Sequence, residues 1–136
     1  MHFDDAICDE NDPVDLESSR PDFAVLCYPV ISSDENFSHK GSFVNLLGDE
    51  ATPELLKYYS GEKQIKENTP PVFLWHTADD GVVPSENSME FAQALAENGI
   101  PCELHIYPSG RHGLGLAKGL HPESWKKHLV KWMKTI

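Results

Sequence analysis

Three short apolar runs, separated by polar segments with helical signals, constrain the fold more than any other feature of the sequence. The runs are FAVLCYP (Phe23–Pro29), VFLWHT (Val72–Thr77) and CELHIYP (Cys102–Pro108). The first two are almost continuously apolar, as buried parallel strands are, whereas the third alternates as an edge strand does. Strands that alternate with helices in this way predict an α/β fold, with about three parallel strands and flanking helices.

Helical signals fill the segments between and after the three runs. Thr52–Ser60 predicts a short helix with a threonine cap and a proline in its first turn. Longer helices are predicted over Ser85–Asn98, which ends before a glycine, and over Pro122–Ile136. The apolar faces of these two helices are Met89, Ala92, Leu95 and Ala96, and Trp125, Leu129, Trp132, Met133 and Ile136.

Charge and hydropathy exclude several classes of partner. No run of about 18 apolar residues is present, so no membrane span is predicted. The acidic N-terminus lacks the basic start and the apolar run of a signal peptide. The formal net charge is −11, and residues 1–68 hold 15 of the 22 acidic side chains against 5 of the 11 basic ones. An acidic surface disfavours nucleic acids and anionic membranes, so we expect neither as a partner.

The three cysteines do not predict a disulfide framework, because their number is odd and their spacing is wide. Cys27 and Cys102 lie inside apolar runs and are interpreted as buried thiols. Free thiols are typical of a reducing compartment, so we expect a cytoplasmic location.

Ionisable side chains follow two neighbouring strands of the predicted sheet. Asp79 and Asp80 come directly after the second apolar run, and His112 follows the third, within the turn SGRHG. The carboxyl ends of parallel strands lie at one edge of a sheet, where ligands bind, and a crossover places consecutive strands side by side. We therefore expect Asp80 and His112 to face each other, with the carboxylate accepting the Nδ1–H of the imidazole.

Each of these motifs alone also has a purely structural explanation. An Asp-Asp-Gly sequence after a strand forms turns in which an aspartate caps the backbone, and a histidine beside glycine fits an ordinary loop. The coincidence of both motifs at the edge where sites form favours a catalytic pair. His76, at the end of the second apolar run, is interpreted as a structural hydrogen-bonding residue.

Two turns connect these residues to a known family. A D-x-x-V-P turn lies at Asp80–Pro84 and a histidine–glycine turn at His112–Gly113, within a stretch from Pro70 to Ala117. This stretch resembles the C-terminal part of an α/β hydrolase of the esterase/lipase group. It is similar to the acetyl-xylan-esterase-like and feruloyl-esterase-like carbohydrate esterases, and the similarity extends back through RPDFAVLCYPVIS. The resemblance covers most of this chain but only about the last half of such a fold.

The resemblance implies specific roles. In the register of that family, Asp80 is the acid and His112 the base of a Ser-Asp-His triad, while Asp79 caps the turn or stays solvated. The implied activity is that of a serine carboxylic-ester hydrolase on a small-molecule ester, such as an acetyl ester of a carbohydrate, without a cofactor or metal. The remaining histidines have no zinc-like spacing. They are His2, His39, His105, His121 and His128.

The resemblance also organises the chain. Residues 1–136 are predicted to form the C-terminal part of one α/β-hydrolase domain, opened by an acidic connecting segment at residues 1–22. A helical and loop excursion follows at residues 31–68, and residues 69–136 carry the acid and the histidine. Aromatic side chains of the excursion either line an acyl or sugar pocket or simply cover the sheet. They are Phe37, Phe43, Tyr58 and Tyr59.

The nucleophile motif of the family, G-x-S-x-G, does not occur in the sequence, and neither does an HGGG-like stretch for an oxyanion hole. We expect both upstream of Met1, so the chain alone should have negligible esterase activity. Without central partner strands, the Phe23–Pro29 strand keeps an unpaired edge, which predicts self-association or a complementary N-terminal half.

Two alternatives stay open at this point. A serine peptidase of the prolyl-oligopeptidase type has similar acid and histidine turns. A non-catalytic α/β module would instead keep the two turns as relics or as binding loops. A G-x-S-x-G motif upstream of Met1 would favour an enzyme, whereas a true start codon at Met1 would favour the module.

Overall fold

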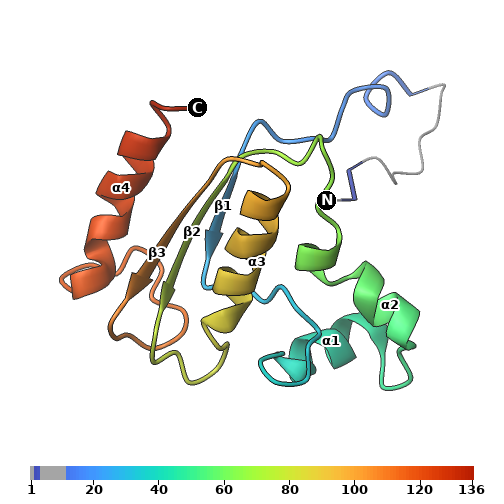
Figure 1. Ribbon diagram of the computed structural model, residues 1–136, viewed down its shortest axis with the longest axis horizontal. Coiled ribbons are helices and arrows are strands. Elements are labelled where there is room, and N and C mark those ends of the chain that lie inside the picture. The colour runs from blue at the N-terminus through green and yellow to red at the C-terminus, as the bar shows by residue number, and fades with distance from the viewer. Residues whose placement is uncertain (1, 4–11) are drawn as a thin grey trace.

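The computed structural model describes residues 2, 3 and 12–136, so residues 1 and 4–11 of the predicted connecting segment lie outside it. Figure 1 shows the described strands side by side, with α3 and α4 on opposite sides of the sheet. In chain order the elements are β1 (Ala24–Cys27), α1 (Lys40–Leu47), α2 (Pro53–Tyr58), η1 (Gly61–Lys63), β2 (Val72–Thr77), α3 (Glu86–Glu97), β3 (Cys102–Tyr107), η2 (His121–Ser124) and α4 (Trp125–Trp132). None of the helices in the described residues combines the length and the apolar composition needed to cross a lipid bilayer.

The three strands form one parallel sheet in the order β1-β2-β3. Val72 of β2 pairs with Ala24 of β1 and with Cys102 of β3, so the strands run in one direction from a common level. The parallel sheet predicted from the apolar runs is therefore confirmed. Its topology places the ends of β2 and β3, which precede the aspartates and the histidine, side by side at one edge.

β1 differs from β2 in burial. All six residues of β2 are buried, whereas all four residues of β1 are half-buried. Within the described residues, no strand pairs with the outer edge of β1. Cys27 and Cys102 are accordingly half-buried rather than buried as predicted, because both lie on edge strands. The burial that they have still raises the pKa of both thiols.

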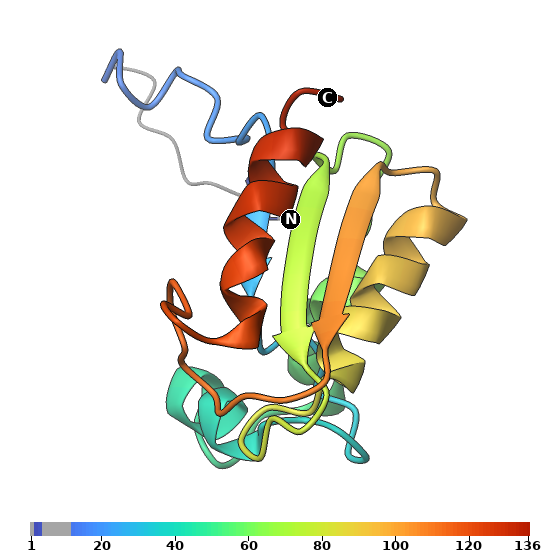
Figure 2. The same cartoon turned by 90° about the vertical axis from the view of Figure 1, so that its left-hand side faces the viewer.

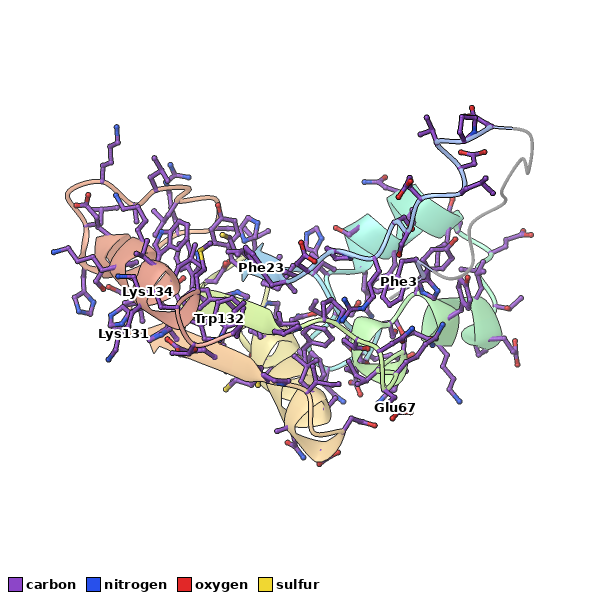
Figure 3. All side chains as sticks on the ribbon, turned by 90° about the horizontal axis from the view of Figure 1, so that it is seen from above. Phe3, Phe23, Glu67, Lys131, Trp132 and Lys134 are labelled. Carbon is purple, nitrogen blue, oxygen red and sulfur yellow. The ribbon has the colours of Figure 1, made fainter. Side chains whose placement is uncertain are left out.

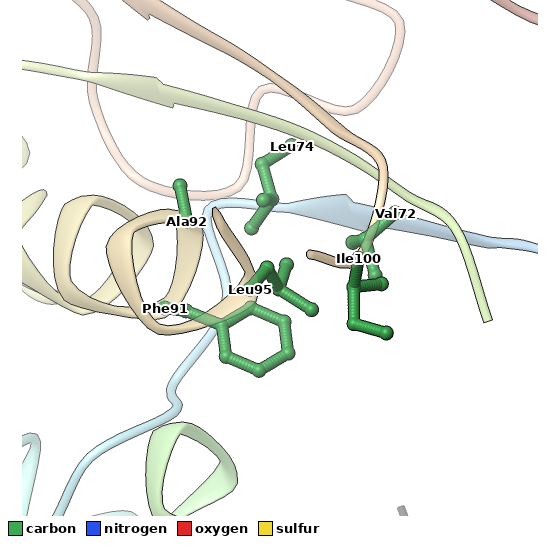
Figure 4. Packing of buried hydrophobic residues seen from close by; sticks show 6 residues of the cluster. All are labelled: Val72, Leu74, Phe91, Ala92, Leu95 and Ile100. Atoms are coloured by element: carbon green, nitrogen blue, oxygen red, sulfur yellow. The ribbon is translucent and has the colours of Figure 1, made fainter. Parts of the chain in front are cut away.

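α3 covers one face of the sheet. Val72 and Leu74 of β2 point towards this helix and pack against Phe91, Leu95 and Ile100 (Figure 4). None of these five side chains is more than 8% exposed. Burying an apolar side chain of this size contributes about 1.5–3 kcal/mol, so this cluster is a principal source of stability.

α4 covers the opposite face (Figure 2). The alternate residues of β2 point towards this face. Phe73 and Trp75 pack there against Trp125 and Trp132. The rings of Trp75 and Trp125 stack with centroids 5.4 Å apart. Trp132 meets Phe23 edge-on at 5.9 Å between α4 and the sheet (Figure 3). β2 therefore holds both helical layers together in a three-layer α/β/α arrangement.

The buried face of α3 differs from the predicted one. Met89 and Ala96 are exposed, whereas the polar side chains of Asn87 and Ser88 are completely buried. Hydrogen bonds explain the difference: Ser88 Oγ lies 2.8 Å from Nδ1 of His76, and Asn87 bonds four backbone groups. Ala92 and Leu95 are buried as predicted, but because satisfied polar groups occupy two other buried positions, the spacing of apolar residues alone identified only part of the face.

The last helix also begins and ends differently from the prediction. Pro122 lies in the first turn of the 3₁₀ segment η2, and regular α-helix starts only with α4. After Trp132 the α-helical hydrogen bonding gives way to a tighter turn, in which the N–H of Thr135 donates to the carbonyl of Trp132 three residues earlier. Met133 and Ile136, predicted to be on the apolar face, are 43% and 48% exposed.

The helical excursion contains α1, α2 and η1, of which the sequence predicted only the helix at α2. The Thr52 hydroxyl accepts the N–H of Leu55 at 3.3 Å, which is the predicted cap. The start of the excursion is fixed by Asn87, whose Oδ1 accepts the N–H groups of Ile31 and Ser32, both at 2.9 Å. The excursion is thereby attached to the first turn of α3.

Candidate active site

Asp80 lies in the acid loop, residues 78–85, which connects β2 to α3. Its Oδ1 accepts the N–H groups of Val82 and Val83 at 2.9 and 3.0 Å, and its side chain is fully buried. An aspartate that accepts N–H groups two and three residues ahead closes its own turn. The local sequence Asp-Gly-Val-Val therefore fixes Oδ1 of the carboxylate through backbone groups of the same loop.

His112 lies in the histidine loop, residues 108–120, which connects β3 to η2. Its Nδ1 is 2.8 Å from Oδ2 of Asp80, so the contact predicted from the sequence is present. An ionised carboxylate only accepts, so Nδ1 carries the proton of this bond, and Nε2 is the nitrogen that faces away from the acid. The side chain of His112 is 30% exposed, and within the described residues Nε2 makes no hydrogen bond.

The charge of Asp80 is set by opposing effects. Burial raises the pKa of Asp80, but the N–H groups of Val82 and Val83, together with the hydrogen bond and the charge of His112, outweigh it. The pKa of Asp80 therefore lies below the ordinary value of 3.8, and the side chain is ionised at neutral pH. The ionised carboxylate accepts the Nδ1–H of His112 and so fixes the orientation of the imidazole.

His76 supports the acid loop from beneath. Its Nε2 is 2.9 Å from the carbonyl oxygen of Val83 and 3.4 Å from Oδ2 of Asp80, and its side chain is fully buried. Because a carbonyl only accepts, Nε2 donates and Nδ1 accepts from the Ser88 hydroxyl. Burial lowers the pKa of His76 below 6.5, so the ring is neutral at pH 7. These bonds agree with the structural role predicted for this histidine.

The histidine loop is clamped on both sides of Gly110. Its N–H donates to Oδ1 of Asp79 at 2.7 Å, and its carbonyl accepts the Thr77 hydroxyl at 2.7 Å. A Cβ at this position would lie 2.7 Å from Leu114 and 2.9 Å from Thr77, so only glycine fits without displacement. Asp79 is exposed and caps the neighbouring loop, whereas Asp80 alone bonds the imidazole.

Tyr28, directly after β1, is a further contact of the imidazole that sequence reasoning missed. Its ring meets His112 edge-on at 4.8 Å and Trp75 edge-on at 5.0 Å, and its hydroxyl accepts the N–H of Gly115 at 3.0 Å. Its φ of +41° is rare for an aromatic residue, and such strain concentrates at functional sites. The sequence signal that could have identified Tyr28 is its position: it follows the first predicted strand, at the edge of the sheet where Asp80 follows the second.

The sequence pattern of the Prolyl oligopeptidase family matches residues 32–136, which include both Asp80 and His112. The chain belongs to this family. The match covers more than half of the chain and spans the acid loop, the histidine loop and both helical layers.

Two relatives of this member of the prolyl oligopeptidase family are, by name, a xylanase and an acetylxylan esterase. The chain is 45% identical over 125 residues to endo-1,4-beta-xylanase B of Butyrivibrio fibrisolvens and 38% identical over 122 residues to an acetylxylan esterase of Xylanibacter ruminicola. These alignments cover 92% and 86% of this chain but only 19% and 25% of the relatives.

A solved structure is similar over nearly the whole chain. The acetyl ester-xyloside bifunctional hydrolase of Caldicellulosiruptor lactoaceticus superposes with a TM-score of 0.91 at 50% identity. The superposition covers 98% of this chain and 49% of that structure. The chain therefore has the fold of the last part of an α/β hydrolase and spans about half of that protein, and less of the two sequence relatives.

The serine residues in the described part of the chain do not supply a nucleophile that is bonded to His112. Within the described residues, no serine hydroxyl hydrogen-bonds the imidazole of His112. Ser60, which precedes a glycine, is buried and bonded instead to Ser33 and to the carbonyl of Leu56. The pair of Asp80 and His112 is therefore an acid and a base without a bonded nucleophile.

A hollow lies on the helical excursion. Its volume is about 160 Å³, and its lining consists of Val30, Ser42, Phe43, Leu46 and Tyr59. Two of the four aromatic residues singled out in the sequence thus line a hollow. Neither Asp80 nor His112 is part of this lining, so the hollow and the acid–base pair are separate features.

Proposed function

We propose that the chain supplies the acid, Asp80, and the general base, His112, of a Ser-His-Asp triad in a carboxylic-ester hydrolase. The observation that carries this proposal is the 2.8 Å hydrogen bond from Nδ1 of His112 to the buried carboxylate. This bond leaves the lone pair of Nε2 directed away from the acid, as a general base requires. The similarity to esterases of the α/β-hydrolase type supports the same assignment.

The proposed reaction is an acyl transfer in two halves. A serine hydroxyl from another part of the full-length protein attacks the ester carbonyl while Nε2 of His112 takes the hydroxyl proton. The intermediate collapses, the bond to the alcohol breaks, and His112 returns the proton to the leaving alcohol. A water molecule then repeats these steps on the acyl-enzyme, and Asp80 stabilises the imidazolium in both halves. No metal or organic cofactor takes part in this proposed reaction.

A second part of the proposal concerns the 136-residue chain by itself. Its sequence contains neither G-x-S-x-G nor an HGGG-like oxyanion motif. Removing the nucleophile of a triad lowers kcat by several orders of magnitude, about 10⁶-fold in a serine protease. We therefore expect the isolated chain to hydrolyse p-nitrophenyl acetate no faster than background.

For the substrate class we propose an acetyl ester of a carbohydrate. Two relatives support it by name, an acetylxylan esterase and an acetyl ester-xyloside bifunctional hydrolase. The name of the matching family instead suggests a peptidase, which is the second candidate. Acetylated xylan compared with a proline-containing peptide p-nitroanilide, both tested on the full-length protein, would separate the two.

The experiment that tests the roles is a chimera. The N-terminal half of the Caldicellulosiruptor lactoaceticus hydrolase is fused to this chain, which replaces the matching half of that protein. We expect turnover of p-nitrophenyl acetate, with kcat reduced about 10⁴-fold by Asp80→Asn and at least as much by His112→Ala.

The matched control is His121→Asn, which removes an exposed imidazole at the start of η2, directly after the histidine loop. We expect kcat of this variant to stay within about two-fold of the unmodified chimera, because surface substitutions away from special features have small effects. A His112→Ala chimera that keeps more than a tenth of the activity would contradict the proposed role of His112.

We also propose that the isolated chain self-associates through β1. The outer edge of β1 is unpaired within the described residues, and a hollow of about 180 Å³ lies beside it. Its lining includes Ala24, Leu26, Ile31, Val72 and Phe91. Unpaired edges and apolar hollows favour pairing with a second copy. Light scattering that shows only monomers at high protein concentration would contradict self-association.

The location that we propose is the cytoplasm. Cys27 and Cys102 are free thiols in the structure, which suits a reducing compartment. Fractionation of cells that express the full-length protein, followed by immunoblotting, tests this proposal. Recovery of the protein outside the cells would contradict it.

A further inference from the structure

A cluster of metal-binding side chains lies on the α4 side of the sheet, away from the acid–base pair. Glu103 and His105 are two residues apart on β3, so both side chains point to the face that α4 covers. His105 contacts Phe73 in this layer, with ring centroids 5.4 Å apart. From the other side, α4 directs His128 at the same place, where its ring lies 4.3 Å from that of His105.

The donor atoms of this cluster converge. Oε1 of Glu103 lies 2.7 Å from Nε2 of His105, and one donor atom from each of Glu103, His105 and His128 lies within 4.8 Å of the other two. Donors bound to one zinc ion at about 2.0–2.1 Å lie about 3.3 Å apart in a tetrahedral site. The donor atoms therefore lie near this spacing, and small changes in side-chain torsion angles would adjust them to it.

His128 has no competing use. Within the described residues it makes no hydrogen bond, and its one ring contact is with His105. Lys126, the neighbouring cation, is paired with Glu123 at 3.0 Å, and Lys131 is exposed. The imidazole nitrogens of His128 are therefore available to a ligand.

We propose that Glu103, His105 and His128 form a binding site for a first-row divalent metal ion such as Zn²⁺. Two imidazoles and one carboxylate are ligands that suit zinc, nickel and copper, whereas calcium and magnesium prefer oxygen ligands alone. All three side chains are half-buried, so water completes the coordination from the open side. Sequence reasoning did not detect this site, because its ligands are 2 and 23 residues apart, unlike those of zinc motifs.

The place of the site gives it a structural consequence. β3 ends where the histidine loop begins, and η2 with α4 follows where that loop ends. A metal ion that joins β3 to α4 fixes both ends of the loop that carries His112. The ion would act on the stability of this layer, because an ion that binds only the folded chain stabilises it in proportion to its occupancy.

The test is a calorimetric titration of the 136-residue chain with zinc chloride in metal-free buffer at pH 7. The chain carries Cys8→Ser, so that this third cysteine does not compete for the metal. Cys27 and Cys102 compete little, because burial raises the pKa of both thiols and keeps them protonated. We expect one equivalent of Zn²⁺ to bind and the Tm to rise. His128→Asn should weaken binding by more than about ten-fold and abolish the rise in Tm.

The matched control is His39→Asn, in the helical excursion, where the imidazole bonds Ser42. We expect this variant to bind Zn²⁺ with unchanged affinity. A second measurement uses the unmodified chain, so that no variant has to fold. Substoichiometric Cu²⁺, which is paramagnetic, should broaden the imidazole NMR signals of His105 and His128 before those of the other histidines. The proposal is overturned if no saturable binding is seen, or if His128→Asn leaves the affinity unchanged.

Discussion

The acid loop and the histidine loop meet at one hydrogen bond but are held in place by different means. The carboxylate of Asp80 is fixed by N–H groups of its own loop and is fully buried. His112 is 30% exposed, and its loop is positioned by Asp79, Thr77 and Tyr28, which belong to other segments. The acid is thus a local product of its sequence, whereas the position of the imidazole depends on tertiary contacts.

This difference teaches where each loop is sensitive to substitution. In the acid loop, sensitivity is concentrated in Asp80, because that one side chain closes the turn and receives the imidazole. In the histidine loop, sensitivity is spread over Gly110 and the residues that anchor the loop, Asp79, Thr77 and Tyr28. Four measurements would break or sharpen this contrast.

The largest effect is expected for Asp80→Asn. The amide loses the charge and one of the acceptor positions that satisfy two N–H groups and an imidazole, so we expect the free energy of unfolding to fall by about 2–4 kcal/mol. The matched control is Asp79→Asn, an exposed neighbour that we expect to cost about 0–1 kcal/mol. Urea unfolding measures both values, and equal losses for the two variants would break the contrast.

Gly110→Ala is expected to have the next largest effect. Its new Cβ would lie 2.7 Å from Leu114 and 2.9 Å from Thr77, and overpacking of this kind costs about 1–3 kcal/mol. The control is Gly81→Ala in the acid loop, where a Cβ meets nothing within 4 Å. If urea unfolding showed the Gly110→Ala chain to be as stable as the Gly81→Ala chain, the packing of Leu114 and Thr77 around Gly110 would have room for a methyl group.

A fall of one pH unit is expected to lower the free energy of unfolding by less than the two substitutions above. The pKa of His76 is lowered below 6.5 in the folded chain, so the unfolded chain takes up a proton first as the pH falls through that value, and stability declines. The pKa of Asp80 is lowered below 3.8, so its contribution, present above that value, is lost only at lower pH. One group changes stability by at most about 1.4 kcal/mol per pH unit.

His76→Gln isolates the first of these two effects. Urea midpoints at several values from pH 7 to pH 5 should fall less steeply for the variant than for the unmodified chain. The comparison of slopes removes the contribution of the other histidines, which both proteins share. Parallel slopes would mean that His76 keeps an ordinary pKa in the folded chain.

The smallest effect is expected for Tyr28→Phe. The variant keeps the ring contact with His112 and loses only the hydroxyl that accepts the N–H of Gly115, so the cost is no more than about 1 kcal/mol. The NMR chemical shifts of the His112 imidazole at fixed pH should still change, because its loop loses one anchor. Tyr59→Phe, on the helical excursion, is the control, and identical His112 chemical shifts in both variants would remove Tyr28 from the set of positioning residues.

The parts of the fold that sequence could predict are those encoded locally. The run at Val72–Thr77 predicted β2, because six successive apolar or β-forming residues fit only a buried strand here. The contact of Asp80 with His112 followed from topology, since consecutive parallel strands end at one edge. The helix cap at Thr52 followed from residue type.

The parts that sequence missed depend on partners far apart in the chain. Asn87 and Ser88 are buried because their hydrogen-bond partners lie across the fold, and no apolar periodicity encodes that. Tyr28 meets His112 only because β1 lies beside β2 and its backbone takes a positive φ. Glu103 and His128 approach each other only when α4 lies on β3. Each of these cases needs a tertiary contact before the residue has a recognisable role.

The hydrogen bonds of Asn87 have one further consequence. Its amide nitrogen donates to the carbonyl oxygens of Phe37 and Pro84, which close the first bend of the excursion and the acid loop respectively. The side chain of Asn87 therefore joins the excursion, which bears the hollow, to the acid loop, which bears the carboxylate of Asp80. Loss of this amide would remove, in one step, the hydrogen-bond partner of backbone groups in both segments.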